Sequence, residues 1–193
     1  MAHPFLVGVR EGTLDPARFR RWLVQDRLFV EGSQQLLEAL ASGAPEGLGG
    51  LMAGARAGYR DELVRFDALV GDLGLEPAPI AFVTHAYLQY LLATALQDRA
   101  AGLVCLAVLE RAYLEAWRGV AGGLATDSLW RRLIEQWTTD DFASYVTELE
   151  QAVDRFAVPA SPAERLEQHV DLTIAYELAF WEMAWHGWTW PGG

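Results

Sequence analysis

Three acidic residues stand inside apolar helical patterns, and they are the residues of this sequence best suited to do chemistry. Asp26 lies three residues from both Leu23 and Phe29, and Glu110 and Glu177 lie in similar apolar stripes with steps of three and four residues. An ionised carboxylate is costly to bury without a partner. Each acid therefore has two interpretations: it sits at a stripe edge and reaches solvent, or it is retained inside for a task.

The three acids together favour a shared polar pocket. They belong to three separate helical segments, and Lys and Arg are absent from their stripes, so internal ion pairs do not explain them. Two neighbouring carboxyl groups push each other's pKa values apart, which suits one of them to act as an acid and the other as a base.

Aromatic residues fall on inward-facing positions of the same kind of helix: Phe29, Tyr87, Tyr113 and Trp137. Aromatic side chains at helical spacing are more often core residues than parts of a ligand site. Combined with carboxylates, however, flat rings suit a planar heteroaromatic ligand with amino groups, because rings stack on it and acids accept its N–H donors.

Helix signals dominate the whole chain, and no segment shows sustained period-2 alternation. Pairs such as Asp15-Pro16 and Ser161-Pro162 are typical of helix starts. The pattern predicts an all-α, single-domain bundle over residues 1–193 with about seven helices, at approximately 16–43, 45–73, 80–97, 100–120, from Asp127-Ser128 onward, 139–158 and 162–186.

Composition excludes several classes of protein. The formal net charge of −11 disfavours binding to phosphate backbones and to anionic membrane surfaces. Apolar runs are shorter than a bilayer requires, no signal peptide is recognisable, and the single cysteine, Cys105, allows no intrachain disulfide. We therefore expect a cytoplasmic protein that binds neither nucleic acid nor membrane.

Metal and cofactor motifs are sparse. Glu182 and His186 are four residues apart, but His85 and His169 do not complete an obvious two-metal carboxylate set. There is no phosphate-binding glycine loop of the Walker or Rossmann type. We expect no metal and no cofactor, and a dimetal carboxylate oxygenase is the weakest of three hypotheses.

Several ordered segments resemble one known family. The segments are His3-Pro4-Phe5, Val24 to Phe29, Trp137 to Phe142 and Tyr176 to Trp181. In this order they are similar to the TenA family over nearly the whole chain. The resemblance implies a haem-oxygenase-like helical fold without haem, thiaminase-2 or aminopyrimidine aminohydrolase activity in thiamin salvage, and a homo-oligomer, a dimer or tetramer.

The resemblance also implies roles for individual residues. Asp26 corresponds to the acid that holds the pyrimidine amino group and ring nitrogen, and Phe29 and Tyr87 to aromatic walls of the site. Glu177 corresponds to the general acid/base near the leaving group, and Tyr113 to the tyrosine one turn beyond the family's usual cysteine nucleophile.

The sequence departs from that pattern at the nucleophile. Leu109 stands where the family has its cysteine, and Cys105 lies one turn earlier. Glu110 resembles the branch of the family in which a glutamate replaces the cysteine, and Trp137 stands where a tyrosine is usual.

Two hypotheses about function remain besides the dimetal oxygenase. The first is a hydrolase of an aminopyrimidine that uses the carboxylate pair Glu110 and Glu177, with Asp26, Phe29, Tyr87, Tyr113 and Trp137 binding the substrate. The alternative is a non-catalytic or repurposed member that binds a small heteroaromatic ligand.

Overall fold

Helices form all the regular structure that the computed structural model describes, which covers residues 3–124, 130–188 and 190 and contains no strand. The elements are α1 (Pro4–Glu11), α2 (Pro16–Ala41), α3 (Glu46–Asp72), α4 (Phe82–Gln97), α5 (Arg99–Ala121), α6 (Arg131–Gln136), α7 (Asp140–Ala152), a π-helical turn η1 (Val153–Ala157) and α8 (Ala163–His186). The all-α prediction is confirmed.

Polar caps fix where these helices begin and end. The side chains of Asp15, Asp98 and Thr139 accept backbone N–H groups at the starts of α2, α5 and α7. Such caps satisfy donors that have no partner within the helix. Gly12 and Gly187 end α1 and α8 with positive φ angles of 69° and 79°, which glycine adopts without strain.

The predicted helix boundaries need two corrections, and a third boundary is untested. Helix α1 was not predicted, although His3 caps it through Nδ1, Pro4 occupies its first turn and Gly12 ends it. Helix α7 ends at Ala152 and continues as the π turn instead of running unbroken to about residue 158. The predicted start at Asp127-Ser128 lies outside the described residues, and the described part of that segment is helical from Arg131 to Gln136.

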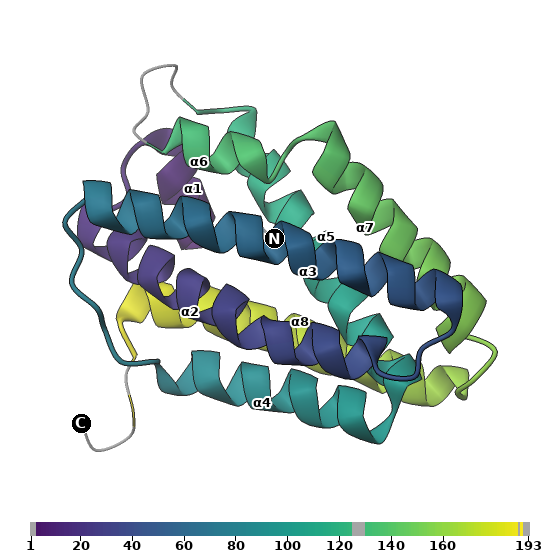
Figure 1. Cartoon of the computed structure of the whole chain (residues 1–193). Helices are drawn as coiled ribbons and strands as arrows, with labels where there is room; N and C mark the ends of the chain where they lie inside the picture. The colour runs from purple at the N-terminus through teal and green to yellow at the C-terminus, as the bar shows by residue number, and fades with distance from the viewer. Residues whose placement is uncertain (1–2, 125–129, 189, 191–193) are drawn as a thin grey trace.

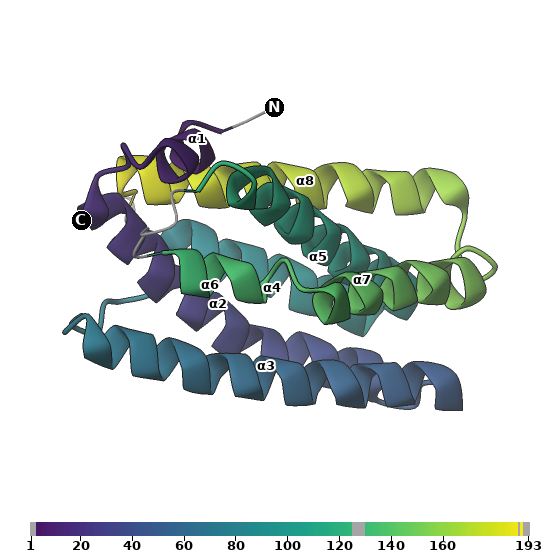
Figure 2. The same ribbon diagram turned by 90° about the horizontal axis from the view of Figure 1, so that it is seen from above.

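Helix α5 is the central element of the bundle. It packs against α1, α2, α4, α6, α7 and α8. Figure 1 shows α2 running between α3 and α4, and Figure 2 shows α3 and α8 on opposite sides of the bundle with α5 crossing between them. A residue that faces inward from α5 therefore meets side chains from several other helices.

A cluster of tryptophan rings fills the core beside the C-terminal part of α5. The Trp22 ring lies 5.0 Å from the Trp117 ring and 5.6 Å from the Trp137 ring, and the Trp181 ring lies 5.7 Å from that of Trp117. All four side chains are buried. Large rings in contact lose little conformational freedom and bury much area, so this cluster holds α2, α5, α8 and the end of α6 together.

None of the helices among the described residues combines the length and the apolar character needed to cross a membrane.

The tight corner between α4 and α5 provides a test of the packing. A Cβ atom on Gly102 would lie 2.6 Å from the Ala95 Cα and 3.1 Å from Leu40 Cδ2. We expect Gly102→Ala to lower the free energy of unfolding by about 2 kcal/mol, because the backbone must shift. The exposed Gly119 on the same helix has nothing within 4 Å of that position, so Gly119→Ala raises stability by up to ~1 kcal/mol. Urea denaturation of both variants measures this, and equal effects contradict the assigned packing.

Candidate active site

A cavity opens between the helices next to the tryptophan cluster. Its empty volume is about 530 Å³, part of which opens to solvent. The lining side chains come from α2, α3, α4, α5, α7 and α8 and from the end of α6, and they are Asp26, Phe29, Val30, Tyr59, Glu62, Tyr87, Leu109, Glu110, Tyr113, Trp137, Phe142, Glu177, Phe180 and Trp181. The mixture of aromatic rings with a few polar groups suits a small heteroaromatic molecule.

Four carboxyl groups line this cavity, each from a different helix. Asp26 belongs to α2, Glu62 to α3, Glu110 to α5 and Glu177 to α8. Asp26 and Glu110 each expose only 4% of their surface, and Glu62 and Glu177 are partly buried. No Lys, Arg or His is among the described lining residues. The cavity therefore concentrates acidic groups without a cation on its wall.

Aromatic side chains supply the hydrogen bonds to Asp26 and Glu177. The Tyr113 hydroxyl donates to Asp26 Oδ2 at 2.6 Å, and the Tyr87 hydroxyl donates to Glu177 Oε1 at 2.8 Å. These are neutral donors, so each bond satisfies a carboxyl oxygen without neutralising its charge.

The other two carboxyl groups are held in the same way. The Tyr59 and Tyr145 hydroxyls donate to Glu110 Oε1 at 2.6 and 3.2 Å, and Trp137 Nε1 donates to Glu62 Oε1. In all four groups the remaining carboxyl oxygen receives no hydrogen bond from the described residues. One oxygen orients each group, and the other is free to accept a donor from a ligand.

Burial raises the pKa of all four carboxyl groups. The pKa of Glu110 is raised to about 8 and that of Glu177 to about 7, chiefly because burial disfavours the charged form. The hydrogen bonds from the tyrosine hydroxyls act in the opposite direction and lower both pKa values. The pKa of Asp26 lies well above its ordinary value for the same reason, and the charges of Glu62, Glu177 and Glu110 raise it further. Glu110 and Glu177 thus titrate near neutral pH.

Stacked rings form the apolar walls. The Phe29 ring lies 5.0 Å from the Tyr87 ring and 5.7 Å from the Phe180 ring, and the Tyr113 and Trp137 rings meet edge to face at 5.3 Å. Asp26 and Phe29 face the same cavity because residues three apart share one side of a helix.

Comparison with known proteins identifies the relatives of this chain. The model of the TENA/THI-4/PQQC family matches residues 1–187. The chain belongs to this family. TenA homologues from Pyrococcus furiosus and from P. horikoshii OT3 have solved structures that are 29% and 27% identical in sequence, with TM-scores of 0.89 and 0.82. The alignments cover 94% and 96% of this chain and 90% of each homologue.

A protein of Glycine max described as "Probable bifunctional TENA-E protein" is 23% identical over 194 residues, covering 94% of this chain and 85% of its own length. The TenA-type, haem-oxygenase-like fold implied by the sequence is confirmed by the likeness to the Pyrococcus furiosus structure.

All the site residues predicted from the sequence meet in this TenA cavity. Glu177, Glu110, Asp26, Phe29, Tyr87, Tyr113 and Trp137 line it together. In the sequence the apolar stripe around Glu177 comprises Val170, Ile174, Trp181 and Ala184. This stripe needs one correction, because Ile174 is 44% exposed and does not belong to the buried face of α8.

Sequence reasoning missed the contribution of α3. Tyr59 and Glu62 line the cavity, and Tyr145 on α7 bonds Glu110. A signal for the α3 pair was present, because Ala55, Tyr59, Glu62 and Phe66 follow steps of four, three and four residues, the pattern that singled out the other acids.

The cysteine lies outside the cavity. Cys105 is fully buried, its Sγ lies 3.5 Å from the Tyr90 hydroxyl, and burial raises the pKa of its thiol. Leu109 lines the cavity in the position that the family resemblance gives to the nucleophile. A protonated, packed thiol is a poor nucleophile.

Metal-binding side chains do not gather in the described part of the chain, where no group of three or more His, Cys, Asp or Glu residues could hold a metal ion. Glu182 and His186, which the sequence placed on one face of a helix, contact each other there, with His186 Nε2 3.0 Å from Glu182 Oε2.

The raised pKa of Glu110 predicts a pH-dependent stability. Folding moves this pKa from about 4.5 to about 8, so the stabilising contribution of the protonated group is complete below the lower value and is lost as pH rises through the upper one. Glu110→Gln cannot ionise but keeps an oxygen for Tyr59 and Tyr145. We therefore expect its free energy of unfolding, relative to that of the wild type, to increase by a few kcal/mol from about pH 5 to about pH 9. Each pH unit between the two pKa values contributes ~1.4 kcal/mol to this increase.

Urea denaturation at both pH values measures this difference. The exposed acid Glu148 serves as the matched control, since Glu148→Gln removes the same charge from the surface. If Glu110→Gln and Glu148→Gln respond alike to pH, Glu110 does not titrate as assigned.

Proposed function

We propose that this TenA family member hydrolyses an aminopyrimidine, using Glu110 and Glu177 as an acid–base pair. The observation that carries this proposal is the cavity itself, in which four carboxyl groups and a set of aromatic walls face one small space. A planar ring with several N–H donors complements such a space both in shape and in hydrogen bonding.

Binding of the ring follows from the positions of Asp26 and the aromatic side chains. One oxygen of Asp26 is held by the Tyr113 hydroxyl and the other is free. The free oxygen accepts a hydrogen bond from the exocyclic amino group of the ring or from a protonated ring nitrogen. Phe29 and Tyr87 supply walls on which the pyrimidine stacks. Trp137 and Tyr113 bound the ring at its other side.

The chemical step needs one carboxyl protonated and the other ionised. The protonated carboxyl keeps a proton on the departing nitrogen, so that the C–N bond breaks with release of neutral ammonia. The ionised carboxyl accepts a proton from the attacking water, whose hydroxyl bonds to the methylene carbon. Burial raises the pKa of Glu110 and of Glu177 toward neutral, so one carboxyl of the pair can hold a proton while the other is ionised.

We further propose that the chain belongs to the branch of the TenA family in which a glutamate replaces the cysteine. Leu109 removes the thiol, and the neighbouring Glu110 projects into the same cavity.

A non-catalytic, ligand-binding member is the second candidate. It is favoured by Leu109 in the nucleophile position and by the Trp137 N–H group, which donates its hydrogen bond to Glu62.

The homo-oligomer implied by the family resemblance also stays a prediction.

Kinetics of three variants test the proposed function. We expect Glu110→Gln and Glu177→Gln each to lower kcat/KM for an aminomethylpyrimidine by at least about 100-fold, since each removes a group that transfers a proton. Cys105→Ala serves as the control, because the thiol lies outside the cavity, and it should leave kcat/KM within about twofold of the wild type.

Ammonia release measures turnover, and a thermal-shift assay measures binding. Full activity of both glutamine variants contradicts the acid–base assignment. Stabilisation of the wild type by a pyrimidine without any ammonia release favours the second candidate. Loss of activity in Cys105→Ala supports a mechanism in which the thiol is the nucleophile.

A further inference from the structure

Glu62 is the cavity carboxyl that has no role in the reaction described above. It comes from α3, on the side of the cavity opposite α8, and it is partly buried, whereas Asp26 and Glu110 are almost completely so. A carboxylate on a cavity wall that neither binds the ring nor moves a proton is free to recognise another feature of the substrate.

Trp137 fixes the orientation of this group. Trp137 Nε1 donates to Glu62 Oε1, while Glu62 Oε2 receives no hydrogen bond from the described residues. The Trp137 side chain is only 3% exposed, and its ring stacks on that of Trp117 at 5.3 Å. The donor is therefore held in place by ring packing, and the second oxygen of Glu62, a residue of the cavity wall, is left without a partner among the described residues.

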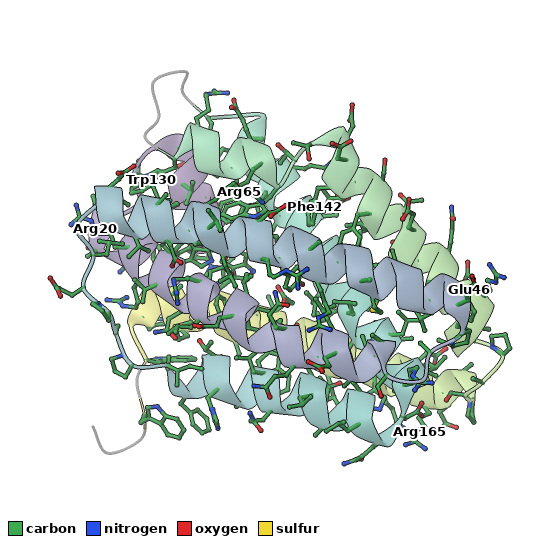
Figure 3. The ribbon with its side chains drawn as sticks, viewed as in Figure 1. Arg20, Glu46, Arg65, Trp130, Phe142 and Arg165 are labelled. Atoms are coloured by element: carbon green, nitrogen blue, oxygen red, sulfur yellow. The ribbon has the colours of Figure 1, made fainter. Side chains whose placement is uncertain are left out.

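Glu62 also has the most favourable surroundings for carrying a charge. Burial raises its pKa, but the Trp137 N–H bond and the positive charge of Arg65 both oppose this shift. Arg65 lies three residues further along α3, and Figure 3 labels its side chain in the region between α3 and the start of α7, near Phe142. No cation lowers the pKa of the other three cavity carboxyl groups among the described residues.

We propose that Glu62 is a specificity-determining residue that recognises a positive charge on the substituent of the substrate. This inference rests on the proposed function. A primary alkyl amine, like the lysine side chain, is protonated at neutral pH, so an aminomethyl substituent enters the cavity as an ammonium group. Its N–H donors and its charge match the free oxygen of Glu62.

The same contact separates substrate from product. Hydrolysis converts the ammonium-bearing pyrimidine and water into a neutral hydroxymethylpyrimidine, ammonia and the proton that the ionised carboxyl accepts. Ammonia and this proton together make an ammonium ion, so both atoms and charge balance. The retained product lacks the charge that Glu62 attracts, and it keeps only the ring contacts with Asp26 and the aromatic walls. Glu62 thus strengthens binding of the substrate more than binding of the product, which limits product inhibition.

The experiment compares two ligands that differ only at the substituent, which is a charged ammonium group in one and a neutral hydroxyl group in the other. Binding of the aminomethylpyrimidine and of its hydroxymethyl analogue is measured by calorimetry in a Glu177→Gln background, with and without Glu62→Gln. The added Gln keeps an oxygen for Trp137. We expect Glu62→Gln to weaken binding of the aminomethyl ligand by about tenfold or more and to leave the hydroxymethyl ligand within about twofold.

Asp61→Asn provides the matched control. It removes the same formal charge from the adjacent, exposed residue of α3, which is not part of the cavity wall. We expect it to change both affinities by less than about twofold, because exposed charges are screened by salt.

The outcomes separate this inference from the function on which it rests. Equal weakening of both ligands by Glu62→Gln, or no weakening of either, overturns the role of Glu62 while wild-type ammonia release continues to support the hydrolase. Selective weakening in a protein that releases no ammonia supports the role of Glu62 and overturns the hydrolase. If neither ligand binds before Glu62 is changed, both proposals fall.

Discussion

The site depends on one interaction, the hydrogen bond from a neutral aromatic donor to a buried carboxyl group. It recurs at Tyr113–Asp26, Tyr87–Glu177, Tyr59–Glu110 and Trp137–Glu62. A guanidinium in place of these donors would neutralise each acid and keep its pKa low. Phenol and indole groups orient the acid and leave its pKa raised. The carboxyl groups thereby remain able to exchange protons near neutral pH and to attract a cationic ligand.

The bundle exists in this form because those donors and acceptors come from different helices. The Tyr59–Glu110 bond joins α3 to α5, and the Tyr87–Glu177 bond joins α4 to α8. Two members of the tryptophan cluster, Trp137 and Trp181, line the same cavity as these groups. Concentrating four acids in one cavity opposes folding whenever they ionise, so the surrounding apolar contacts must offset that free energy. A ligand that carries N–H donors and positive charge relieves the same cost when it binds.

The sequence predicted the class of fold and most of the site for an identifiable reason. Helix caps and apolar periodicity are local, so α2 and α8 could be placed closely from Asp15-Pro16 and from the approach to Gly187. The stripes around Asp26 and Glu110 showed acids facing inward for the same reason. Helix α1 was missed because it has only eight residues, and its stability comes from packing against α5 and α8.

Glu62 was missed because exposed glycines and arginines on α3 obscure its apolar stripe. The donor pairs could not be predicted at all, since Tyr87 and Glu177 are 90 residues apart in the chain. The most direct test of this account is a carbon-13 NMR titration of the glutamate carboxyl groups in the unliganded protein, with Glu110→Gln and Glu177→Gln used to assign the signals. The account predicts midpoints near 8 for Glu110 and near 7 for Glu177. Midpoints at the ordinary glutamate value of about 4.5 for both residues would contradict it.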